Sequence, residues 1–550
     1  MEYLTIAIIT LMIISIPVML INSIIQNNKK LKIQLISSFG RSPAEKEYEI
    51  NSIKKYSQYK KANINNELRI DDITWNDLNM DAVFKKINVC LTSIGEEYLY
   101  NCLQELQSDP THLLEREKMI EFFADNSDER LAVQFSLAKL GKVSHNGLSS
   151  FIFKHNITLF KYPFIFNVLT IIPLLCALIL FYSIILGVIC IFTSFAINLV
   201  VYTISKRKLN IEIPAIIYFS SLLNCCRKLC KINNIKIFPV IVELKKKYDI
   251  FKPLESKLPL PRVISGNIME DIFEYLNILF LIDIRNYNKC MKMIIKYNNE
   301  FHSLYKGIGE LDLTLCVLSF RKSLQVYSIP EFHEENSIIF EDIFHPLITS
   351  PIKNSGMLMN DSLITGSNAS GKSTFIKALA INGILAQTIY TTTALKFKTR
   401  FSIIITSMAM RDDLLAGDSY FIVEVKSLKR IIDLIQKYHC TCFIDEILRG
   451  TNTVERIASS SSVLEYLHSQ DCLCIVASHD IELTNILADK FDNYHFCEQI
   501  TNDEVNFDYK LKQGPSTTRN AIKLLSLLGF NQEIVKNAEK MSFEYDNKKL

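Results

Sequence analysis

The sequence lacks a strong charge of either sign, a disulfide-like arrangement of cysteines and the Cys-x-x-Cys spacing of zinc sites. Its 61 basic and 58 acidic residues leave a net charge of only +3, so overall charge neither requires nor excludes a nucleic acid partner. No long basic stripe and no alternation of basic and aromatic residues marks a DNA-binding surface. The 550 residues are enough for several folding units.

The cysteines include two Cys-x-Cys pairs in apolar runs, Cys440–Cys442 and Cys472–Cys474. Residues i and i+2 of a strand share a face, so these pairs could hold a metal ion. Without Cys-x-x-Cys spacing, thiols buried in a protein of the reducing cytosol are the simpler interpretation.

Charge is also absent from a run at the amino terminus. Leu4 to Ile25 is uncharged and has about the length that crosses a bilayer. No basic region precedes it and no cleavage site follows; instead it ends at Lys29, Lys30 and Lys32. The pattern favours an uncleaved anchor with its carboxy-terminal side in the cytoplasm over a signal peptide.

A second uncharged run, Tyr162 to Ser205, is too long for one span. It suits two spans, Phe164–Tyr182 and Ile184–Ile204, with basic residues on both flanks. The prediction is a membrane hairpin with both ends in the cytoplasm, and hence three transmembrane helices in all. The alternative is a hairpin buried in a soluble protein, but such a core rarely supplies so long an uncharged run.

The rest of the chain changes character near residue 336. Before it, apolar residues recur at helical spacing and no acid–base or nucleophile constellation occurs, which predicts an all-α core or lever region. After it, short β-rich runs alternate with helices, which predicts an α/β domain with phosphates at the strand carboxyl ends. The predicted parts are an anchor (1–26), a helical segment (27–161), the hairpin (162–205), a helical lever (206–335) and the α/β domain (336–550).

The α/β domain contains a phosphate-loop pattern. LITGSNASGKSTFIK has the spacing G-x-x-x-x-G-K-S from Gly366 to Ser373, in which glycines allow backbone N–H groups to converge on phosphate at a helix amino terminus. Lys372 is expected to reach the β- and γ-phosphates and Ser373 to bind Mg²⁺. By itself the pattern could also be an ordinary strand, turn and helix with a fortuitous Gly-Lys-Ser.

Two later strands end in residues that complement this loop. Phe443 and Ile444 lead into Asp445 and Glu446, and the run Leu473–Ala477 leads into Ser478 and His479. Asp445 can hold Mg²⁺, Glu446 can activate a water, and His479 can hydrogen-bond the γ-phosphate. Loop, carboxylates and histidine at three strand ends therefore predict an ATP site.

These motifs resemble those of the MutS mismatch-repair ATPases. TGSNASGKST, Thr365–Thr374, is similar to the family's TGPNMGGKST, and DEILRGTNT, Asp445–Thr453, is similar to DEIGRGTST with Leu448 replacing Gly. AGDSYFIVEV, residues 416–425, resembles SGRSTFMVEM, and SHDIELT, residues 478–484, resembles THYFELT. The resemblance implies an α/β P-loop ATPase domain of the ABC-type or MutS-like class.

The resemblance further implies an ATP hydrolase that uses Mg²⁺. Glu446, His479 and Lys372 are the expected catalytic residues, and Ser373 and Asp445 the expected Mg²⁺ ligands. Met357 matches the family's adenine-stacking Phe, and Ser419 matches a serine that reaches the nucleotide of the opposite subunit. The expected nucleotide-binding residues are Gly366, Ser367, Asn368, Ala369, Ser370, Gly371, Lys372, Ser373, Thr374, Met357 and Ser419.

The sequence also departs from the family. We find no amino-terminal mismatch-reading domain with its Phe-x-Glu wedge, and the predicted hairpin lies about where the family inserts its DNA-clamp arms. The resemblance implies a homodimer through the ATPase domains. The predicted spans place it in a membrane, expected to be a bacterial inner membrane, with the ATPase domain in the cytoplasm.

Three functions fit this sequence. The first is a DNA-associated ATPase of mismatch repair or recombination. The second is a mechanochemical membrane scaffold that binds no DNA and is driven by ATP-dependent dimer closure. The third is a transporter-type ATPase, which is disfavoured because the predicted spans are few and carry no internal charge to mark a substrate path.

Overall fold

The computed structural model divides the chain into two compact units. Unit 1 comprises Met1–Asn65, Ile87–Asn101 and Arg116–Ser323, and unit 2 comprises Asn66–Lys86, Cys102–Glu115 and Leu324–Leu550. The described residues are 21–43, 47–63, 68–143, 147–153, 159–209, 212–255, 258, 275–367, 370–408, 420–500, 505–516, 522, 525 and 529–549.

Unit 1 is helical, and its central element is the long helix α16 (Asn298–Ser323). Helix α5 (Ser93–Cys102) docks on α16 through the buried carboxylate of Asp312, which accepts hydrogen bonds from Leu91 N at 2.9 Å, Thr92 N at 2.8 Å and Thr92 Oγ1 at 2.6 Å. Desolvation raises the pKa of Asp312 to about 6. The carboxylate satisfies N–H groups that the start of α5 leaves free.

The other helices of this part of the chain follow in sequence order. They are α2 (Ile50–Asn63), α6 (Thr111–Asp125), α7 (Ser127–Leu140), α8 (Leu148–Ile152), α9 (Phe164–Ile179), α10 (Ile184–Lys208), α11 (Glu212–Leu229), η1 (Asn234–Ile237), α12 (Pro239–Phe251), η2 (Lys252–Leu254), α14 (Ile282–Arg285) and α15 (Tyr287–Lys296). Residues 21–38 are also helical.

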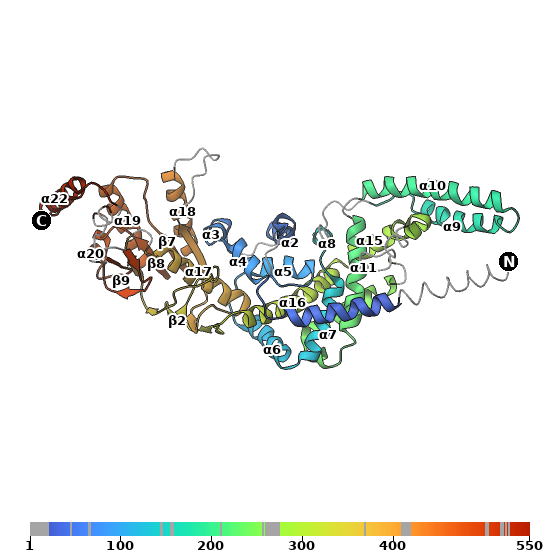
Figure 1. Ribbon diagram of the computed structural model, residues 1–550, viewed down its shortest axis with the longest axis horizontal. Coiled ribbons are helices and arrows are strands. Elements are labelled where there is room, and N and C mark those ends of the chain that lie inside the picture. Colours follow the sequence, from blue (N-terminus) through green and yellow to red (C-terminus); the bar gives the residue numbers. More distant parts are fainter. Residues whose placement is uncertain are drawn as a thin grey trace. The chain divides into compact units, whose positions relative to one another are not determined.

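Helices α9 and α10 pack against each other as a hairpin (Figure 1). Some of its polar side chains turn inward: Asn198 Nδ2 donates to Leu279 O at 2.7 Å, and Thr170 Oγ1 donates to Phe280 O at 2.9 Å. Its large apolar side chains face outward, with Phe192 70% exposed. The exterior of the hairpin is therefore more apolar than its seam.

The structure corrects the prediction of three spans. Within the described residues, α10 is the one helix long and apolar enough to cross a bilayer. Helix α9 has 16 residues, about 24 Å of helix, which is short of an apolar core about 30 Å thick. The predicted anchor Leu4–Ile25 lies mainly in residues 1–20, outside the described residues.

Unit 2 is built on a six-stranded sheet in the order β12-β9-β4-β8-β7-β6. Every residue of β4, β7 and β8 is buried, as is typical of central parallel strands covered on both faces. Only β12 is antiparallel to its neighbour. The strands are β4 (Ser362–Thr365), β6 (Ile403–Met408), β7 (Cys440–Asp445), β8 (Cys472–Ser478), β9 (Asp492–His495) and β12 (Lys512–Gln513).

Further sheets and helices complete the unit. A four-stranded sheet has the order β1-β5-β2-β3, and β10 pairs with β11. Their bounds are β1 (Glu331–Phe332), β2 (Ile338–Ile343), β3 (Asn354–Leu358), β5 (Lys396–Thr399), β10 (Glu498–Ile500) and β11 (Val505–Phe507). The helices are α3 (Asp72–Asp77), α4 (Met80–Ile87), α17 (Lys372–Ile389), α18 (Tyr420–Ile435), α19 (Thr453–His468), α20 (Glu482–Ile486) and α22 (Gln532–Lys549).

The alternation of strands and helices predicted beyond residue 336 is confirmed. The helices expected after the loop and before Asp445 are α17 and α18, and the strands expected to end at the carboxylates and at Ser478 are β7 and β8. In Figure 1 these elements form one α/β group, coloured orange to red.

Helix α3 covers the edge strand β6. Thr406 N donates to Thr74 Oγ1 at 3.1 Å, and Asp77 Oδ2 accepts from Thr406 Oγ1 at 2.6 Å and Met408 N at 3.1 Å. Side chains of α3 thus replace the neighbouring strand that an edge lacks. Burial raises the pKa of Asp77.

Candidate active site

Two glycines with positive φ shape the turn between β4 and α17. Gly366 has φ +146°, and a Cβ there would lie 2.6 Å from the carbonyl oxygen of Phe496. Gly371 has φ +102°, and a Cβ there would lie 3.0 Å from the ring of Tyr509. A side chain would be strained and crowded at both positions, so the turn itself requires the glycine spacing.

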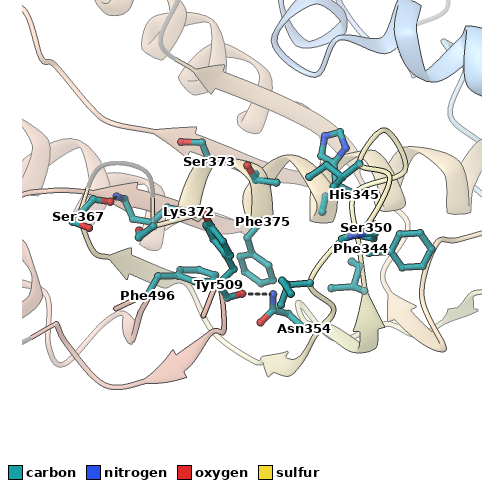
Figure 2. A pocket seen from close by; sticks show the side chains of 18 of the residues that line it. Phe344, His345, Ser350, Asn354, Ser367, Lys372, Ser373, Phe375, Phe496 and Tyr509 are labelled. Atoms are coloured by element: carbon teal, nitrogen blue, oxygen red, sulfur yellow. Dashed lines mark hydrogen bonds between the residues drawn. The ribbon is translucent and has the colours of Figure 1, made fainter. Parts of the chain in front are cut away.

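The Lys372 side chain folds back onto this turn. Its Nζ donates to the carbonyl oxygens of Gly366 at 2.7 Å and Ser367 at 2.8 Å, and the residue is only 4% exposed. Figure 2 shows Lys372 beside Ser367, with Ser373 at the start of α17. A buried positive charge is therefore held at the loop.

Strands β4, β8 and β7 end at one edge of the sheet. Thr365 pairs with Ser478, and Ala477 pairs with Asp445. Asp445 is buried, and within the described residues its Oδ1 has no hydrogen-bond partner. A buried carboxylate oxygen in that state is costly unless a cation meets it. Asp445, with the exposed hydroxyl of Ser373 in the first turn of α17, fits Mg²⁺, which prefers oxygen ligands.

Glu446 leaves β7 in a left-handed conformation, with φ +61°. Its N–H donates to the carbonyl of Ala477 at 2.9 Å, which fixes the turn to the neighbouring strand. The carboxylate then has two partners: Oε1 lies 2.8 Å from Nε2 of His479, and Oε2 pairs with Nε of Arg449. A backbone conformation that costs a non-Gly residue about 1 kcal/mol or more thus orients this carboxylate.

His479 links Glu446 to the loop. Its Nδ1 donates to the carbonyl of Gly366 at 2.8 Å and lies 3.5 Å from Nζ of Lys372. Because Nδ1 carries a proton, the contact between Nε2 and Glu446 requires a second proton, held by the imidazole or by the carboxyl group. Burial lowers the pKa of His479, and the charge of Lys372 lowers it further. The pair therefore holds a transferable proton beside the loop.

A cavity of about 480 Å³ opens beside these residues, within the size range of small-molecule sites. Its far wall is formed by the segment 343–354 and by Tyr509 (Figure 2). Asn354 joins the two, because its Nδ2 donates to Tyr509 O at 3.0 Å and its Oδ1 accepts from Leu511 N at 2.8 Å. The lining includes Ser367, Ser370, Gly371, Lys372, Ser373, Thr374, Glu446 and His479, opposite Phe344, His345, Ile348, Ile352 and Tyr509.

Among the described residues, three expected site residues do not line this cavity: Met357, Gly366 and Asp445. Met357 lies on β3, is 59% exposed and does not line the cavity; its carbonyl accepts from Tyr494 Oη at 2.8 Å. Asn368, Ala369 and Ser419 lie outside the described residues.

The structure adds residues that motif reasoning missed. Tyr509 has φ +49° and Ile352 is 48% exposed, and both line the cavity. Arg449 pairs with Glu446. The Pro residues next to His345 and Ile352 mark an irregular segment that could have drawn attention, but only the tertiary fold brings Tyr509 to the loop.

Within the described residues, no group of three or more His, Cys, Asp or Glu side chains could hold a metal ion by side chains of those types alone. The Cys-x-Cys pairs face each other across β7 and β8, with Cys440 opposite Cys472 and Cys442 opposite Cys474, and all four thiols are buried. Burial raises the pKa of Cys440 to about 12.

A glycine turn before a helix, with a buried lysine and an aligned Asp, Glu and His at the strand ends, is characteristic of nucleotide-binding α/β domains. Residues 362–545 match the family model "MutS domain V". Over those residues, the chain is thus similar to domain V of the MutS family. It is 27% identical over 286 residues to the DNA mismatch repair protein MutS of Listeria monocytogenes and 27% identical over 297 residues to that of Streptococcus pneumoniae.

These alignments cover only part of each chain. They cover 49% and 52% of this chain but only 33% and 34% of the two relatives. The chain therefore matches about a third of the length of each relative.

Proposed function

We propose that this protein is a MutS-type ATPase that binds Mg²⁺·ATP in the cavity beside the Gly366–Ser373 loop and hydrolyses it. One observation carries the proposal: Lys372, His479 and Glu446 form a continuous chain of contacts around the loop, beside a buried Asp445 oxygen without a partner among the described residues. A merely structural turn has no need of this arrangement.

Each side chain has a role in this proposal. Lys372 exchanges the loop carbonyls for the β- and γ-phosphates, and Gly366 and Gly371 allow close backbone approach. Ser373 and Asp445 hold Mg²⁺, whose charge offsets that of the phosphates. The base packs against Tyr509 and Ile352 in place of Met357, because those two side chains line the cavity.

Glu446 is proposed as the general base that orients and deprotonates the attacking water. Its contacts with Arg449 and His479 hold the carboxylate at the loop. For a water to reach it, one of these contacts has to open. His479 can then turn to hydrogen-bond the γ-phosphate through Nε2 while its Nδ1 stays in contact with the Gly366 carbonyl.

The dimer belongs to the same proposal. In it, Ser419 of one chain completes the site of a second chain, so ATP stabilises the closed dimer and hydrolysis reopens it. Sedimentation of the Glu446→Gln variant is expected to show a dimer with ATP and a monomer without it. Ser419→Arg is expected to abolish the ATP-dependent dimer and to keep ATP binding; a dimer equally strong in this variant would contradict the shared site.

The candidate partners are DNA and a membrane. Association with DNA is suggested by the relatives, which are DNA mismatch repair proteins. Anchoring in a membrane is favoured by the exposed apolar surface of α9 and α10, which includes Ile185, Phe192 and Ile204 at 63–75% exposure. A scaffold that moves a membrane hairpin without DNA is therefore the second candidate function.

The first test of the proposal is nucleotide binding. Lys372→Ala is expected to weaken binding of a fluorescent ATP analogue at least tenfold, because a charge-assisted contact to phosphate is lost. Lys437→Ala, an exposed lysine of the same domain, is the matched control and is expected to bind normally. Equal binding by both variants would refute the assignment of the cavity.

The second test separates the candidate functions. ATPase rates are compared with and without perfect, mismatched and branched duplexes at low and moderate salt. Stimulation by one of these duplexes supports a DNA-associated ATPase. No stimulation and no salt-sensitive binding supports the membrane scaffold.

A further inference from the structure

Two lysines of unit 1 lie beside the Phe135 ring of α7, and a third, Lys228 of α11, lies close enough to Lys139 to repel its charge. Lys32, on the helix 21–38, lies with its Nζ 5.4 Å from the centre of the Phe135 ring, and Lys139 of α7 lies 4.6 Å from it. Lys228 comes from α11, which packs on α7 through the hydrogen bond from Cys225 Sγ to Ser136 O at 3.4 Å. Lys32 and Lys139 are exposed and Lys228 is half-buried. We call these three residues the lysine cluster.

Within the part of the chain that the structure describes, the cluster has no acidic partner. Within the described residues, none of the three ammonium groups takes part in a salt bridge. Partial burial lowers the pKa of Lys139, and repulsion from Lys228 and then from Lys32 lowers it further. Like charges held together without compensation favour an anion between them.

The cluster is held in place by the docking of the helix 21–38. At its end, the centre of the Phe39 ring lies 4.3 Å from the guanidinium of Arg130 and 5.4 Å from the ammonium of Lys322. Gly40 N donates to Ser319 Oγ at 3.0 Å, and Leu35 is 4% exposed. The helix is thus fixed to α7 and α16, so Lys32 is positioned before any ligand arrives.

The same helix places the cluster next to an apolar surface. Ile21, Ile24 and Ile25 are 54–59% exposed. Lys32 follows Ile25 by seven residues, which is about 10 Å along a helix. The headgroup layer of a bilayer extends about 5–8 Å beyond its apolar core, so a long lysine at this height reaches lipid phosphate.

We propose that Lys32, Lys139 and Lys228 form a binding site for the phosphate of an anionic phospholipid headgroup. The site rests on the membrane association in the proposed function. A lipid phosphate is favoured over the phosphates of DNA because the apolar side chains lie on the same helix as Lys32, whereas a duplex would gain nothing from them. The site adds a lipid preference that anchoring by apolar helices alone would not give.

The test uses the full chain in a non-ionic detergent, with binding followed by microscale thermophoresis. Short-chain phosphatidylglycerol, short-chain phosphatidylcholine, inorganic phosphate and a DNA duplex are titrated separately. The variant Lys32→Gln/Lys139→Gln/Lys228→Gln removes the cluster. The variant Lys245→Gln/Lys246→Gln/Lys247→Gln removes the same charge from α12 of the same unit and is the matched control.

The expected result is saturable binding of phosphatidylglycerol, with phosphatidylcholine at least tenfold weaker. Loss of the cluster should weaken phosphatidylglycerol binding about 100-fold, as three lysines near a lipid surface predict, and the control should change it less than threefold. Equal losses in both variants, or equal affinity for both lipids, would overturn the site. Tighter binding of the duplex or of inorganic phosphate, lost with the same cluster, would assign it to nucleic acid or to a free anion instead.

Carbonate extraction of membranes from cells that express the protein keeps the two proposals apart. A chain that is extracted by carbonate but still binds phosphatidylglycerol through the cluster would contradict membrane anchoring and leave the site in place. A chain that resists extraction but loses no phosphatidylglycerol binding in the cluster variant would contradict the site alone.

Discussion

At the scale of single residues, the candidate site contains residues in energetically unfavourable backbone conformations and a buried polar atom without a hydrogen bond. Glu446 and Leu448 both have positive φ, at +61° and +55°, although neither is a glycine. Asp445 keeps a buried oxygen without a partner among the described residues. Such features persist in native structures where the surrounding contacts hold the residue in place in spite of the energetic cost. They are frequent at functional sites.

A pH dependence of stability follows from His345 in the cavity wall. Burial, with a further contribution from Lys377, lowers the pKa of His345 from 6.5 to about 4. A lowered histidine pKa contributes stability that is complete above pH 6.5 and is lost as the pH falls from 6.5 towards 4. Between pH 6.5 and 5 the loss should be roughly 2 kcal/mol at most.

Urea unfolding at pH 7 and pH 5 checks this prediction. His345→Gln should unfold with a smaller difference between the two pH values than the unmodified chain. The control is His112→Gln on α6, because the His112 side chain is 68% exposed and should leave the difference unchanged. An unaltered pH difference in His345→Gln would show that this histidine is not the cause.

At the scale of elements, the loop that carries His479 is tied to α19. Arg456 Nε donates to Asp480 Oδ2 at 2.9 Å and Arg456 Nη2 donates to Oδ1 at 2.7 Å. Bidentate pairs fix geometry as well as adding energy. We therefore expect both residues to act by positioning His479 rather than by touching the nucleotide.

This positioning role predicts that substitutions at the pair lower the turnover rate without weakening ATP binding. Asp480→Asn should lower kcat about tenfold while the ATP Kd changes less than threefold, since the loss of one oriented hydrogen bond is worth about 1.4 kcal/mol. The charge swap Arg456→Asp/Asp480→Arg should recover part of kcat. Glu465→Gln, which breaks the exposed pair with Lys490 at the other end of α19, is the control. A parallel fall in stability and binding would indicate a structural role only.

The edge of the sheet gives a second prediction at this scale. Asp77→Ala removes the acceptor for two donors of β6, so it should destabilise the domain by roughly 1–3 kcal/mol. Asn76→Ala, on the exposed face of the same helix, should change the free energy of unfolding by less than about 0.5 kcal/mol. Equal effects in urea unfolding would contradict the account of α3 as an edge cover.

Much of this site could be predicted from the sequence because it lies at strand ends. A strand followed by a glycine turn, or by Asp-Glu or Ser-His, is recognisable locally, and parallel strands bring such ends to one edge. The opposite wall could not be predicted. Tyr509 is hydrogen-bonded to Asn354, at the end of the segment 343–354 and 155 residues away in sequence, and the expected residue Met357 is not among the residues that line the cavity.

In the helical region, too, contacts between residues far apart in sequence could not be predicted. Asp312 caps the start of α5 across a separation of 220 residues, which no periodicity reveals. The uncharged run was predicted as two spans of similar length, whereas the helices break after Ile179 and resume at Ile184, with 16 and 25 residues. Uncharged composition indicates apolar surface but does not fix where a helix ends.

At the scale of the whole molecule, a substitution in the hairpin tests whether the protein is inserted in a membrane. Phe192→Glu places a charge on the 70% exposed face of α10. In a bilayer this charge should cost about 3 kcal/mol and reduce the membrane-bound fraction, whereas in water it would be harmless. Ile237→Glu, at a residue 71% exposed in η1 outside the hairpin, is the matched control and should stay membrane-bound. Identical fractionation of the two variants would argue against insertion of the hairpin.

The central claim is that Glu446 activates water at an ATP site built around the loop. Glu446→Gln keeps the shape of the side chain, and its amide can donate to Nε2 of His479 and accept from Arg449, so the fold should be preserved. The decisive measurement is single-turnover hydrolysis of γ-labelled ATP together with equilibrium ATP binding in this variant. We predict an ATP Kd within about threefold of the unmodified chain and hydrolysis slowed at least about 100-fold. Hydrolysis at the unmodified rate would contradict the account.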